Sequence, residues 1–410
     1  MRPWGRPLEL PSPVARESPA SGMRGVLIVV ALLCHTVDAL RLNAWHSRHR
    51  AAQALRCRAA VAQEVDPAIY EGIGASPSEW LASNADEDLA VVLEALLASC
   101  AQIATKVRTA ACDSEACFSP PISSMADEDE DEGEMAVDVL ANDVLVSKLG
   151  ATGMVSVISS TSDGIEDQQV SGSGFAVALD PLSGTSILDT NFPLGTTFSI
   201  WRGETLQNVT GRELVAAGAC LYGPRTTAFV ALREMPAVHE FLLLEMAGGP
   251  GAGPAGPVAG AGSDGRWAKS NAFGCMREGR MFSPANYPCS ATLEGYAKLI
   301  DHWQREGYAL RYTGTAVVDV LQLLVKGSGV FVSPASPGQR ARPRLLYEAI
   351  PLGFLVEKAG GACSDGEQSV LDIAVRNTDH RTQLAAGSAA EVRRFDSMVG
   401  PSPVQGWLPP

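Results

Sequence analysis

Apolar side chains recur with helical spacing in two segments of the first half of the chain. Over 84–108 they fall on one face of a predicted helix, with Asn84 as a cap and Glu87 three residues later. That face consists of Leu89, Val92, Leu93, Leu96, Ile103 and Val107. The pattern predicts a second helix over 135–149, which ends at Gly150.

From Phe175 onward the pattern changes to short, strongly apolar runs typical of buried strands. Such runs occupy 175–179, 196–201 and 226–232. Further along, helical patterns over 294–306, 315–326 and 347–359 alternate with short strands, and Gly360-Gly361 provides a helix stop. The sequence has no internal repeat, and the mixture predicts a layered α/β or α+β architecture.

Two segments interrupt this pattern. An acidic run contains seven Asp and Glu residues between 127 and 134, and 247–265 is almost entirely Gly, Ala and Pro. Both are interpreted as solvated surface loops. We therefore predict five parts. The first is a removable leader over 1–63, followed by an N-terminal half over 80–245 that contains a redox loop and a metal turn. An insertion over 246–268, a C-terminal half over 269–399 and a tail over 400–410 complete the chain.

Composition narrows the class of protein. The 410 residues are 46% hydrophobic and 19% charged, which is enough apolar material for a buried core. The net charge of −14 argues against nucleic acid as a partner. No apolar run reaches the roughly 18 residues of a membrane span, so no membrane association is expected once the leader is removed.

The charge is unevenly distributed. Residues 1–60 contain nine Arg, no Lys and three acids, so they carry +6 and the remainder carries −20. Met23-Arg24 precedes an apolar run over 25–34, typical of a signal peptide, and 40–63 is rich in Arg and Ala like an organelle transit peptide. This order predicts import into a plastid surrounded by extra membranes, the chloroplast stroma being the destination. An ordinary secreted protein and a misplaced gene start are the alternatives.

The most specific motif is the run from Asp180 to Ser186, Asp-Pro-Leu-Ser-Gly-Thr-Ser, directly after a predicted buried strand. A carboxylate at a strand end binds a hard divalent cation, and backbone N–H groups of a Gly-rich turn bind phosphate oxygens. Many Asp-Pro turns have no such role, so this motif alone leaves the function open.

Nine blocks, in order, resemble the fructose-1,6-bisphosphatase family, and within it the sedoheptulose-1,7-bisphosphatase branch. The blocks are Lys106–Ala110, Ala136–Asn142, Asp189–Phe192, Tyr222–Thr227, Leu310–Gly314, Arg344–Glu348, Pro351–Phe354, Glu357–Gly361 and Ser364–Asp372. The similarity runs from about residue 84 to 399. It implies a five-layered α/β/α/β/α fold, Mg²⁺-dependent phosphatase chemistry on a sugar bisphosphate, and a homo-oligomer, either a dimer or a tetramer.

The resemblance also assigns roles to individual residues. It places Asp180, Glu348 and the Leu182 carbonyl as metal ligands, and Asp138 as the acid that helps to activate the attacking water. It places the turn of Gly184, Thr185 and Ser186 around the scissile 1-phosphate. The far-phosphate contacts it implies are Asn286, Arg311 and Tyr312, with Arg311 reaching a neighbouring subunit. Arg342 occupies the position of a family Lys near the sugar, and its planar guanidinium is not equivalent to an ammonium group.

Two departures from the family pattern concern the metal. Position 183, an Asp ligand in the family, is Ser183 here, and the stretch aligned with a tandem Glu pair, Ile158–Asp163, contains no Glu. Asp163 or Glu166 are candidates to replace that pair. Fewer anionic ligands weaken Mg²⁺ binding, because each repays part of the dehydration cost of the cation.

Cys112 and Cys117 match the redox pair of the sedoheptulose branch, which thioredoxin reduces in that branch. Two cysteines this close in a solvated loop form a small ring that can be reduced. Three functions remain open: hydrolysis of the 1-phosphate of sedoheptulose 1,7-bisphosphate in the Calvin cycle, fructose-1,6-bisphosphatase activity, and a pseudoenzyme that keeps the sugar-phosphate pocket.

Overall fold

A computed structural model describes residues 71–109, 136–161, 168–245 and 265–402, all within the unit Val65–Pro410. The predicted leader, the acidic run, the Gly/Ala/Pro segment up to 264, and both Cys112 and Cys117 lie outside the described residues. Asp163 and Glu166 also lie outside them.

Three helices begin the described chain: α2 (Pro77–Asn84), α3 (Glu87–Thr109) and α4 (Ala136–Ala151). The prediction that Asn84 caps the long helix was wrong. Asn84 ends α2, where its Nδ2 donates to the Trp80 carbonyl, and Asp86 Oδ1 instead accepts from the N–H of Leu89 at 3.1 Å. The short helix α2 was missed, although Ser76 and Glu79 form a capping box ahead of it.

An eight-stranded sheet follows, in the order β2-β1-β3-β4-β5-β6-β7-β8. Apart from β1 and β3, which run parallel, each neighbouring pair in this sheet is antiparallel. Its strands are β1 (Val155–Ser160), β2 (Gln168–Gln169), β3 (Phe175–Ser183), β4 (Leu194–Arg202), β5 (Leu214–Tyr222), β6 (Thr226–Leu232), β7 (Val238–Glu245) and β8 (Arg266–Phe273).

A second sheet of five strands has the order β10-β9-β11-β13-β12. Its strands are β9 (Arg277–Pro284), β10 (Ala309–Leu310), β11 (Ser328–Ser333), β12 (Ala362–Ser364) and β13 (Leu384–Gly387). The helices of this region are α5 (Glu294–Arg305), α6 (Ala316–Lys326), α7 (Ile350–Lys358) and α8 (Ala389–Met398), and a π-helical turn η6 (Leu345–Ala349) leads directly into α7.

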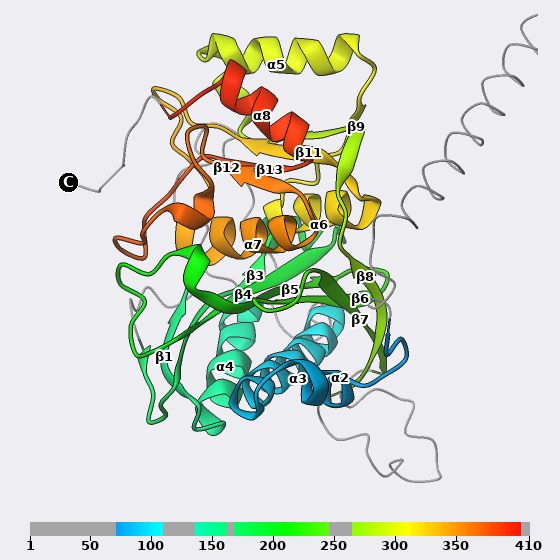
Figure 1. Ribbon diagram of the computed structural model, residues 1–410, viewed down its shortest axis with the longest axis vertical. Helices are drawn as coiled ribbons and strands as arrows, with labels where there is room; N and C mark the ends of the chain where they lie inside the picture. The colour runs from blue at the N-terminus through cyan, green and yellow to red at the C-terminus, as the bar shows by residue number, and fades with distance from the viewer. Residues whose placement is uncertain (1–70, 110–135, 162–167, 246–264, 403–410) are drawn as a thin grey trace, which may run out of the picture. The chain divides into compact units, whose positions relative to one another are not determined.

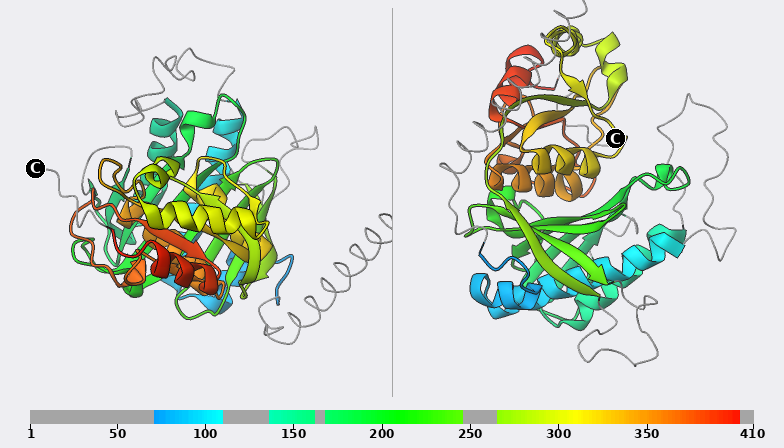
Figure 2. Two further views of the ribbon diagram at one scale, coloured as in Figure 1. Left: turned by 90° about the horizontal axis from the view of Figure 1, so that it is seen from above. Right: turned by 90° about the vertical axis from the view of Figure 1, so that its right-hand side faces the viewer.

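These elements stack in five layers, which confirms the predicted α/β/α/β/α fold (Figures 1 and 2). Helices α3 and α4 cover one face of the eight-stranded sheet, and α6 and α7 lie between the two sheets. Helices α5 and α8 cover the outer face of the five-stranded sheet. Each interface contains its own apolar cluster, and the one between the sheets draws residues from both halves of the chain.

Helix α3 bears on the expectation that no segment spans a membrane. Over Glu87–Arg108 it is long and apolar enough, by those two criteria, to cross a membrane. More than half of that window is buried inside the protein, where Leu93 and Leu96 have no exposed surface. Burial of this kind is what a core helix of a layered fold requires.

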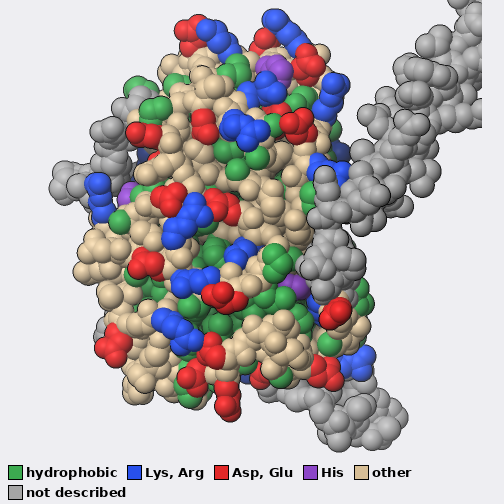
Figure 3. All heavy atoms as spheres, in the orientation of Figure 1, with side chains coloured by type: hydrophobic (Ala, Val, Ile, Leu, Met, Phe, Trp, Pro, Cys, Tyr) green, Lys and Arg blue, Asp and Glu red, His purple; other side chains and the backbone are tan. Residues whose placement is uncertain are grey.

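On the face shown in Figure 3, acidic and basic side chains are interspersed over the surface.

Candidate active site

The first part of the site is a bulge at the end of strand β3. Asp180 pairs in register with Thr197 of β4, but the register shifts before Ser183 pairs with Gly195. Pro181 lies in the irregular stretch, as expected for a residue that has no N–H to donate to a sheet ladder. Its carbonyl accepts from Thr196 Oγ1 at 2.6 Å. The register shift lies directly after Asp180, whose side chain is almost fully buried.

The second part is the π-helical turn η6, which carries Glu348. The backbone N–H of Arg344 donates to Glu348 Oε2 at 2.8 Å. The neighbouring Tyr347 fastens the turn to the large sheet, because its hydroxyl lies 2.8 Å from Ser159 Oγ and its carbonyl accepts from Thr197 Oγ1 at 2.6 Å. These bonds attach η6 to β1 and β4, the two strands on either side of β3. Turns of this type occur often at functional sites.

The structure therefore brings Asp180 and Glu348 together, as the resemblance implies. Burial raises the pKa of Asp180 to about 7, helped by the negative charge of Glu348 and opposed by Thr161, Arg344 and Ser183. Burial also raises the pKa of Glu348, opposed by the Arg344 backbone N–H and by the charges of Arg381 and Arg344. Two buried carboxyl groups close together resist simultaneous ionisation unless a cation compensates them.

Hydroxyl groups surround this carboxylate pair. Thr161 Oγ1 donates to Asp180 Oδ1 at 3.2 Å, and Ser183 also hydrogen-bonds to Asp180. Ser160 precedes Thr161 and pairs in register with Leu179, next to Asp180. Thr161 and Ser183 therefore contact Asp180, and Ser160 pairs with the residue before it. The resemblance places carboxylates of the family at these three positions.

The oxygen donors near Asp180 and Glu348 are of the type that binds a divalent cation, but too few of them are carboxylates. Carboxylate, hydroxyl and carbonyl oxygens are the donors that Mg²⁺ prefers. Over the residues that the structure describes, however, no group of three or more His, Cys, Asp or Glu side chains is placed to hold a metal ion. Asp138 lies in the first turn of α4, nearly buried, and does not join Asp180 and Glu348 in such a group.

The turn after the bulge is held by a close backbone approach. Gly184 has φ of +90°, and a Cβ atom there would lie 2.3 Å from Thr315 Oγ1. A one-turn 3-10 helix, Thr185–Ile187, follows, with Thr185 half-buried and Ser186 exposed. The predicted phosphate turn thus packs on the start of helix α6, and only a glycine satisfies both the conformation and the contact.

Thr315, which Gly184 approaches, caps helix α6, and the first turn of this helix contains Asp319. The sequence analysis did not identify Asp319 as a site residue. Asp319 is completely buried in the first turn of α6, and its two oxygens accept from the Thr313 N–H at 3.0 and 3.2 Å. Burial raises its pKa to about 7, against hydrogen bonds from Thr313 and Gly314. Asp319 thereby shapes the loop that carries Arg311 and Tyr312. An acidic residue in the first turn of the predicted helix 315–326 was the available signal.

Arg311 and Tyr312 are both exposed on this loop, and Tyr312 has 44% of its surface accessible. The loop is pinned at Arg311, whose N–H donates to the Phe282 carbonyl at 2.8 Å and whose carbonyl accepts from Ser283 Oγ. The Arg311 guanidinium donates to the Leu310 carbonyl at 2.8 Å.

Asn286 and Arg342 lie around a second loop, 334–342. Asn286 is 2% exposed, and its Nδ2 donates to the carbonyls of Pro334 at 2.8 Å and Arg340 at 3.0 Å. Its amide protons therefore hold this loop in place. Arg342 is exposed, and its carbonyl accepts from the guanidinium of Arg381.

Fold and site together define a layered α/β protein with a buried carboxylate pair beside a glycine turn at the end of a strand. Two family models match the chain: "Fructose-1-6-bisphosphatase, N-terminal domain" over 78–249 and "Fructose-1-6-bisphosphatase, C-terminal domain" over 275–400. The chain belongs to the fructose-1,6-bisphosphatase family.

Individual relatives agree with this assignment. The chain is 40% identical to the chloroplastic sedoheptulose-1,7-bisphosphatase of Spinacia oleracea, over 80% of this chain and 78% of the relative. It is 32% identical to the class 1 fructose-1,6-bisphosphatase of Geobacter sulfurreducens, over 66% of this chain and 80% of the relative.

Among solved structures, a putative sedoheptulose-1,7-bisphosphatase from Toxoplasma gondii superposes with a TM-score of 0.66 at 31% identity. The superposition covers 79% of this chain and 98% of that structure. A fructose-1,6-bisphosphatase from Leishmania major has the same TM-score and coverage at 21% identity, which supports the fold alone.

Proposed function

We propose that this protein hydrolyses a phosphate monoester of a sugar bisphosphate, with the 1-phosphate of sedoheptulose 1,7-bisphosphate as the scissile group. The observation that carries the proposal is the pairing of Asp180 with Glu348 next to the Gly184 turn, in a chain that belongs to this family. The 40% identity to enzymes named for sedoheptulose bisphosphate favours that substrate over fructose bisphosphate.

In this proposal each residue has a role that its position supports. Asp180, Glu348, the Leu182 carbonyl and the Ser183 hydroxyl would hold Mg²⁺, which neutralises charge on the transferring phosphoryl group when bound. The turn Gly184–Ser186 orients the 1-phosphate, and Asp138 takes a proton from the attacking water. The remaining assigned residues would contact the sugar and the far phosphate: Asn286, Arg311, Tyr312 and Arg342.

The second candidate is a pseudoenzyme that binds sugar phosphates without appreciable turnover. Two observations favour it: Ser183 stands where the family has a metal-binding Asp, and Thr161, rather than a Glu, contacts Asp180. A neutral hydroxyl coordinates Mg²⁺ more weakly than a carboxylate does. Under the enzyme proposal, the described residues therefore supply a weak metal site that needs a high Mg²⁺ concentration.

One assay separates the two candidates. Phosphate release from sedoheptulose 1,7-bisphosphate is measured with reduced protein over a wide range of Mg²⁺ concentration, with fructose 1,6-bisphosphate in a parallel arm. The enzyme proposal expects turnover that rises with Mg²⁺ and saturates late, and faster turnover of the sedoheptulose substrate. Turnover absent at every Mg²⁺ concentration would reject the enzyme proposal.

A repair experiment tests the structural explanation of the weak site. The combined change Ser183→Asp, Ser160→Glu and Thr161→Glu adds carboxylates at the three positions where the resemblance places them. We expect it to lower the Mg²⁺ concentration for half-maximal rate by at least tenfold. The matched control is Ser156→Glu with Ser199→Asp, two buried serines of the same sheet outside the site, which should give no gain. A repaired protein with unchanged Mg²⁺ dependence contradicts the explanation.

The plastid setting is also proposed, since the similar plant and algal enzymes are named chloroplastic. In that setting Cys112 and Cys117 form a disulfide that thioredoxin reduces, and the active form is a homo-oligomer in the Calvin cycle. The phosphate assay checks the redox part directly, because Cys112→Ser should abolish any dependence of the rate on a dithiol reductant. A dependence that survives in Cys112→Ser would assign the switch to other cysteines.

A further inference from the structure

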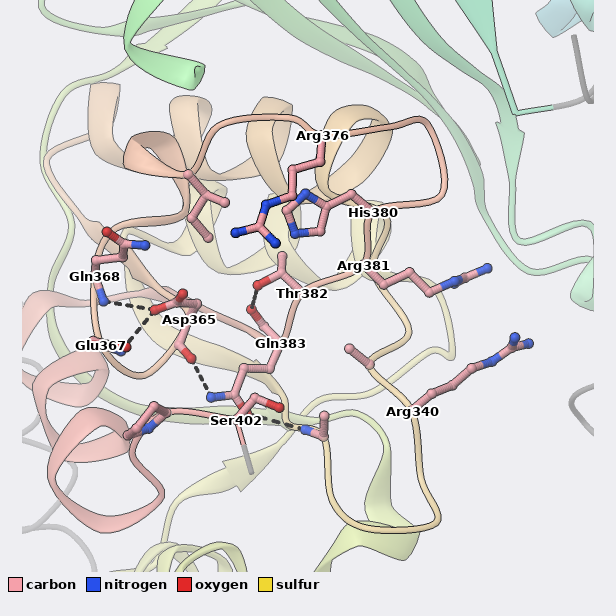
Figure 4. Close-up of a pocket in the computed structure, with 14 residues that line it drawn as sticks. Arg340, Asp365, Glu367, Gln368, Arg376, His380, Arg381, Thr382, Gln383 and Ser402 are labelled. Atoms are coloured by element: carbon pink, nitrogen blue, oxygen red, sulfur yellow. Dashed lines mark hydrogen bonds between the residues drawn. The ribbon is translucent and has the colours of Figure 1, made fainter. Parts of the chain in front are cut away.

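A cavity of about 470 Å³ lies in the C-terminal half, walled by the loops over 335–341 and 365–383 and by residues 401–402 (Figure 4). Its lining residues include Arg381, whose guanidinium donates to the Arg342 carbonyl, so on that side the cavity adjoins the candidate active site. A volume of this size is typical of pockets for small organic molecules. The question is which chemical class of molecule its walls would accept.

The cavity wall carries an excess of positive charge. Three arginines, Arg340, Arg376 and Arg381, line it together with Asp365 and Glu367. In the described part of the chain, neither Arg376 nor Arg381 has a carboxylate within ion-pair distance. Arg340 and Arg376 are exposed, and Arg381 is half-buried.

Asp365, one of the two acidic residues in the wall, already accepts hydrogen bonds within the protein. Asp365 Oδ1 accepts from the backbone N–H groups of Glu367 at 2.9 Å and Gln368 at 2.8 Å. Its carbonyl accepts from Gln383 Nε2, and Gln383 also donates to the Gly400 carbonyl at 2.8 Å. These bonds fix the loop over 365–368 against Gln383, which precedes β13, and Gly400. The cavity is therefore a built feature of the fold.

An unsatisfied donor or acceptor faces the same region. His380 Nδ1 is buried and has no hydrogen-bond partner among the described residues. The guanidinium of Arg376 lies beside the His380 ring, whereas Arg340 and Arg381 extend toward the opposite side of the view, away from Arg376 (Figure 4). Burial and the charge of Arg376 both lower the pKa of His380. A buried polar atom of this kind gains most from a ligand that completes its hydrogen bonds.

The geometry points to a second anion site in this cavity, which binds a small organic phosphate, such as a sugar monophosphate, through Arg376 and His380. Guanidinium groups match phosphate oxygens with paired hydrogen bonds, and a phosphate supplies the negative charge that the wall lacks. The cavity is larger than a phosphate ion needs, and the hydroxyls of Thr382 and Ser402 and the carboxylate of Glu367 are suited to the hydroxyls of a sugar.

Binding is tested by calorimetric titration of the full chain with glucose 6-phosphate, with inorganic phosphate and glucose as separate arms. We expect glucose 6-phosphate to bind more tightly than inorganic phosphate, and glucose not to bind. Arg376→Ala should weaken glucose 6-phosphate binding by tenfold to about a hundredfold, the usual effect of losing a hydrogen bond to a charged group. Equal affinities for the two phosphates would overturn the sugar part of the inference.

The control variants separate this cavity from the proposed active site. Arg305→Ala removes an exposed arginine of α5 that pairs with Asp301 at 3.0 Å, and it should leave binding unchanged. Arg311→Ala alters the far-phosphate loop and should also leave this binding event in place. Binding that is lost in Arg311→Ala and retained in Arg376→Ala would place the anion at the active site and overturn the inference.

A measurement on the unaltered protein covers the case in which Arg376→Ala fails to fold. The imidazole proton signals of the six histidines are followed by NMR during addition of glucose 6-phosphate, and His380→Gln identifies the signal of His380. The inference expects the His380 signal to move and to saturate with the calorimetric affinity. A stationary His380 signal at saturating ligand would reject the site. Neither measurement depends on turnover, so the test stands apart from the proposed hydrolysis.

Discussion

At the scale of single residues, three acidic groups are buried in and beside the candidate site. Asp180, Glu348 and Asp319 are all acidic residues whose pKa is raised by burial. The first two face each other, whereas Asp319 is held by backbone N–H groups and orders a loop. The effect of burial on the pKa of Asp319 can therefore be measured separately from the Asp180–Glu348 pair.

The pH dependence of stability should report on Asp319. Its pKa is about 7 in the folded protein and near 3.8 when unfolded, so folding is favoured by its protonated form. Its favourable contribution is complete below pH 3.8 and is lost as the pH rises to 7 and beyond. Between pH 5 and pH 8, the stability of the wild type relative to Asp319→Asn should fall by about 2.5 kcal/mol.

Denaturant unfolding of both proteins at the two pH values measures this difference. Asp301→Asn, an exposed aspartate on α5, is the control and should show little pH-dependent change relative to the wild type. A wild-type protein that gains stability relative to Asp319→Asn between pH 5 and pH 8 would show that the hydrogen bonds from Thr313 and Gly314 outweigh burial.

At the scale of elements, the candidate site depends on how η6 is attached to the large sheet. Tyr347 makes that attachment through its hydroxyl and its carbonyl, and Glu348 is the next residue. Any displacement of the turn moves the Glu348 carboxylate relative to Asp180. The sheet therefore determines the separation of the two carboxylates, although they come from distant parts of the sequence.

Removal of the Tyr347 hydroxyl tests this attachment. Tyr347→Phe loses the bond to Ser159 and should lower the free energy of unfolding by about 1 to 2 kcal/mol. If turnover is present, its Mg²⁺ dependence should shift several-fold toward higher concentration. Tyr308→Phe is a matched control, since the Tyr308 hydroxyl donates to Glu391 at 2.9 Å in the outer helical layer. A similar shift in the control would mean that the effect is one of general stability.

The elements also show what could be predicted from the sequence. The strand that contains Asp180 and the helices over 294–306 and 315–326 are marked by local signals, namely apolar runs, proline and glycine. The π-helical turn is not, because its conformation depends on bonds from Ser159 and Thr197, far away in the sequence. Likewise, the Thr161 contact with Asp180 and the cavity at Arg376 arise only when separate segments meet.

At the scale of the whole described unit, the two sequence halves share one interior. The apolar cluster between the sheets joins Trp201 and Leu214 from the large sheet with Leu321 and Leu355 from the helices of the second half. Arg212 adds a bridge at the surface, with ion pairs to Glu357 at 2.6 Å and Asp372 at 2.8 Å. Because Arg212 is 46% exposed, this bridge contributes little beside the shared core.

A shared interior predicts cooperative unfolding of both sheets. Hydrogen exchange, followed by mass spectrometry in increasing denaturant, should give the same midpoint for peptides from β5 and from β11. Peptides from the exposed end of α5 serve as the comparison and should exchange earlier by local opening. Separate midpoints for β5 and β11 would mean that the halves unfold independently despite the shared core.

The position of α6 and α7 between the sheets has a consequence for the nascent chain during its synthesis. The large sheet is complete at Phe273, but the helices that cover its inner face extend to Lys358. While a ribosome synthesises the residues between Phe273 and Lys358, the apolar inner face of the large sheet is not yet covered by α6 and α7. The nascent chain should therefore be a client of chaperones until Lys358 has emerged, and ribosome-bound chains truncated before Ala316 should aggregate when released.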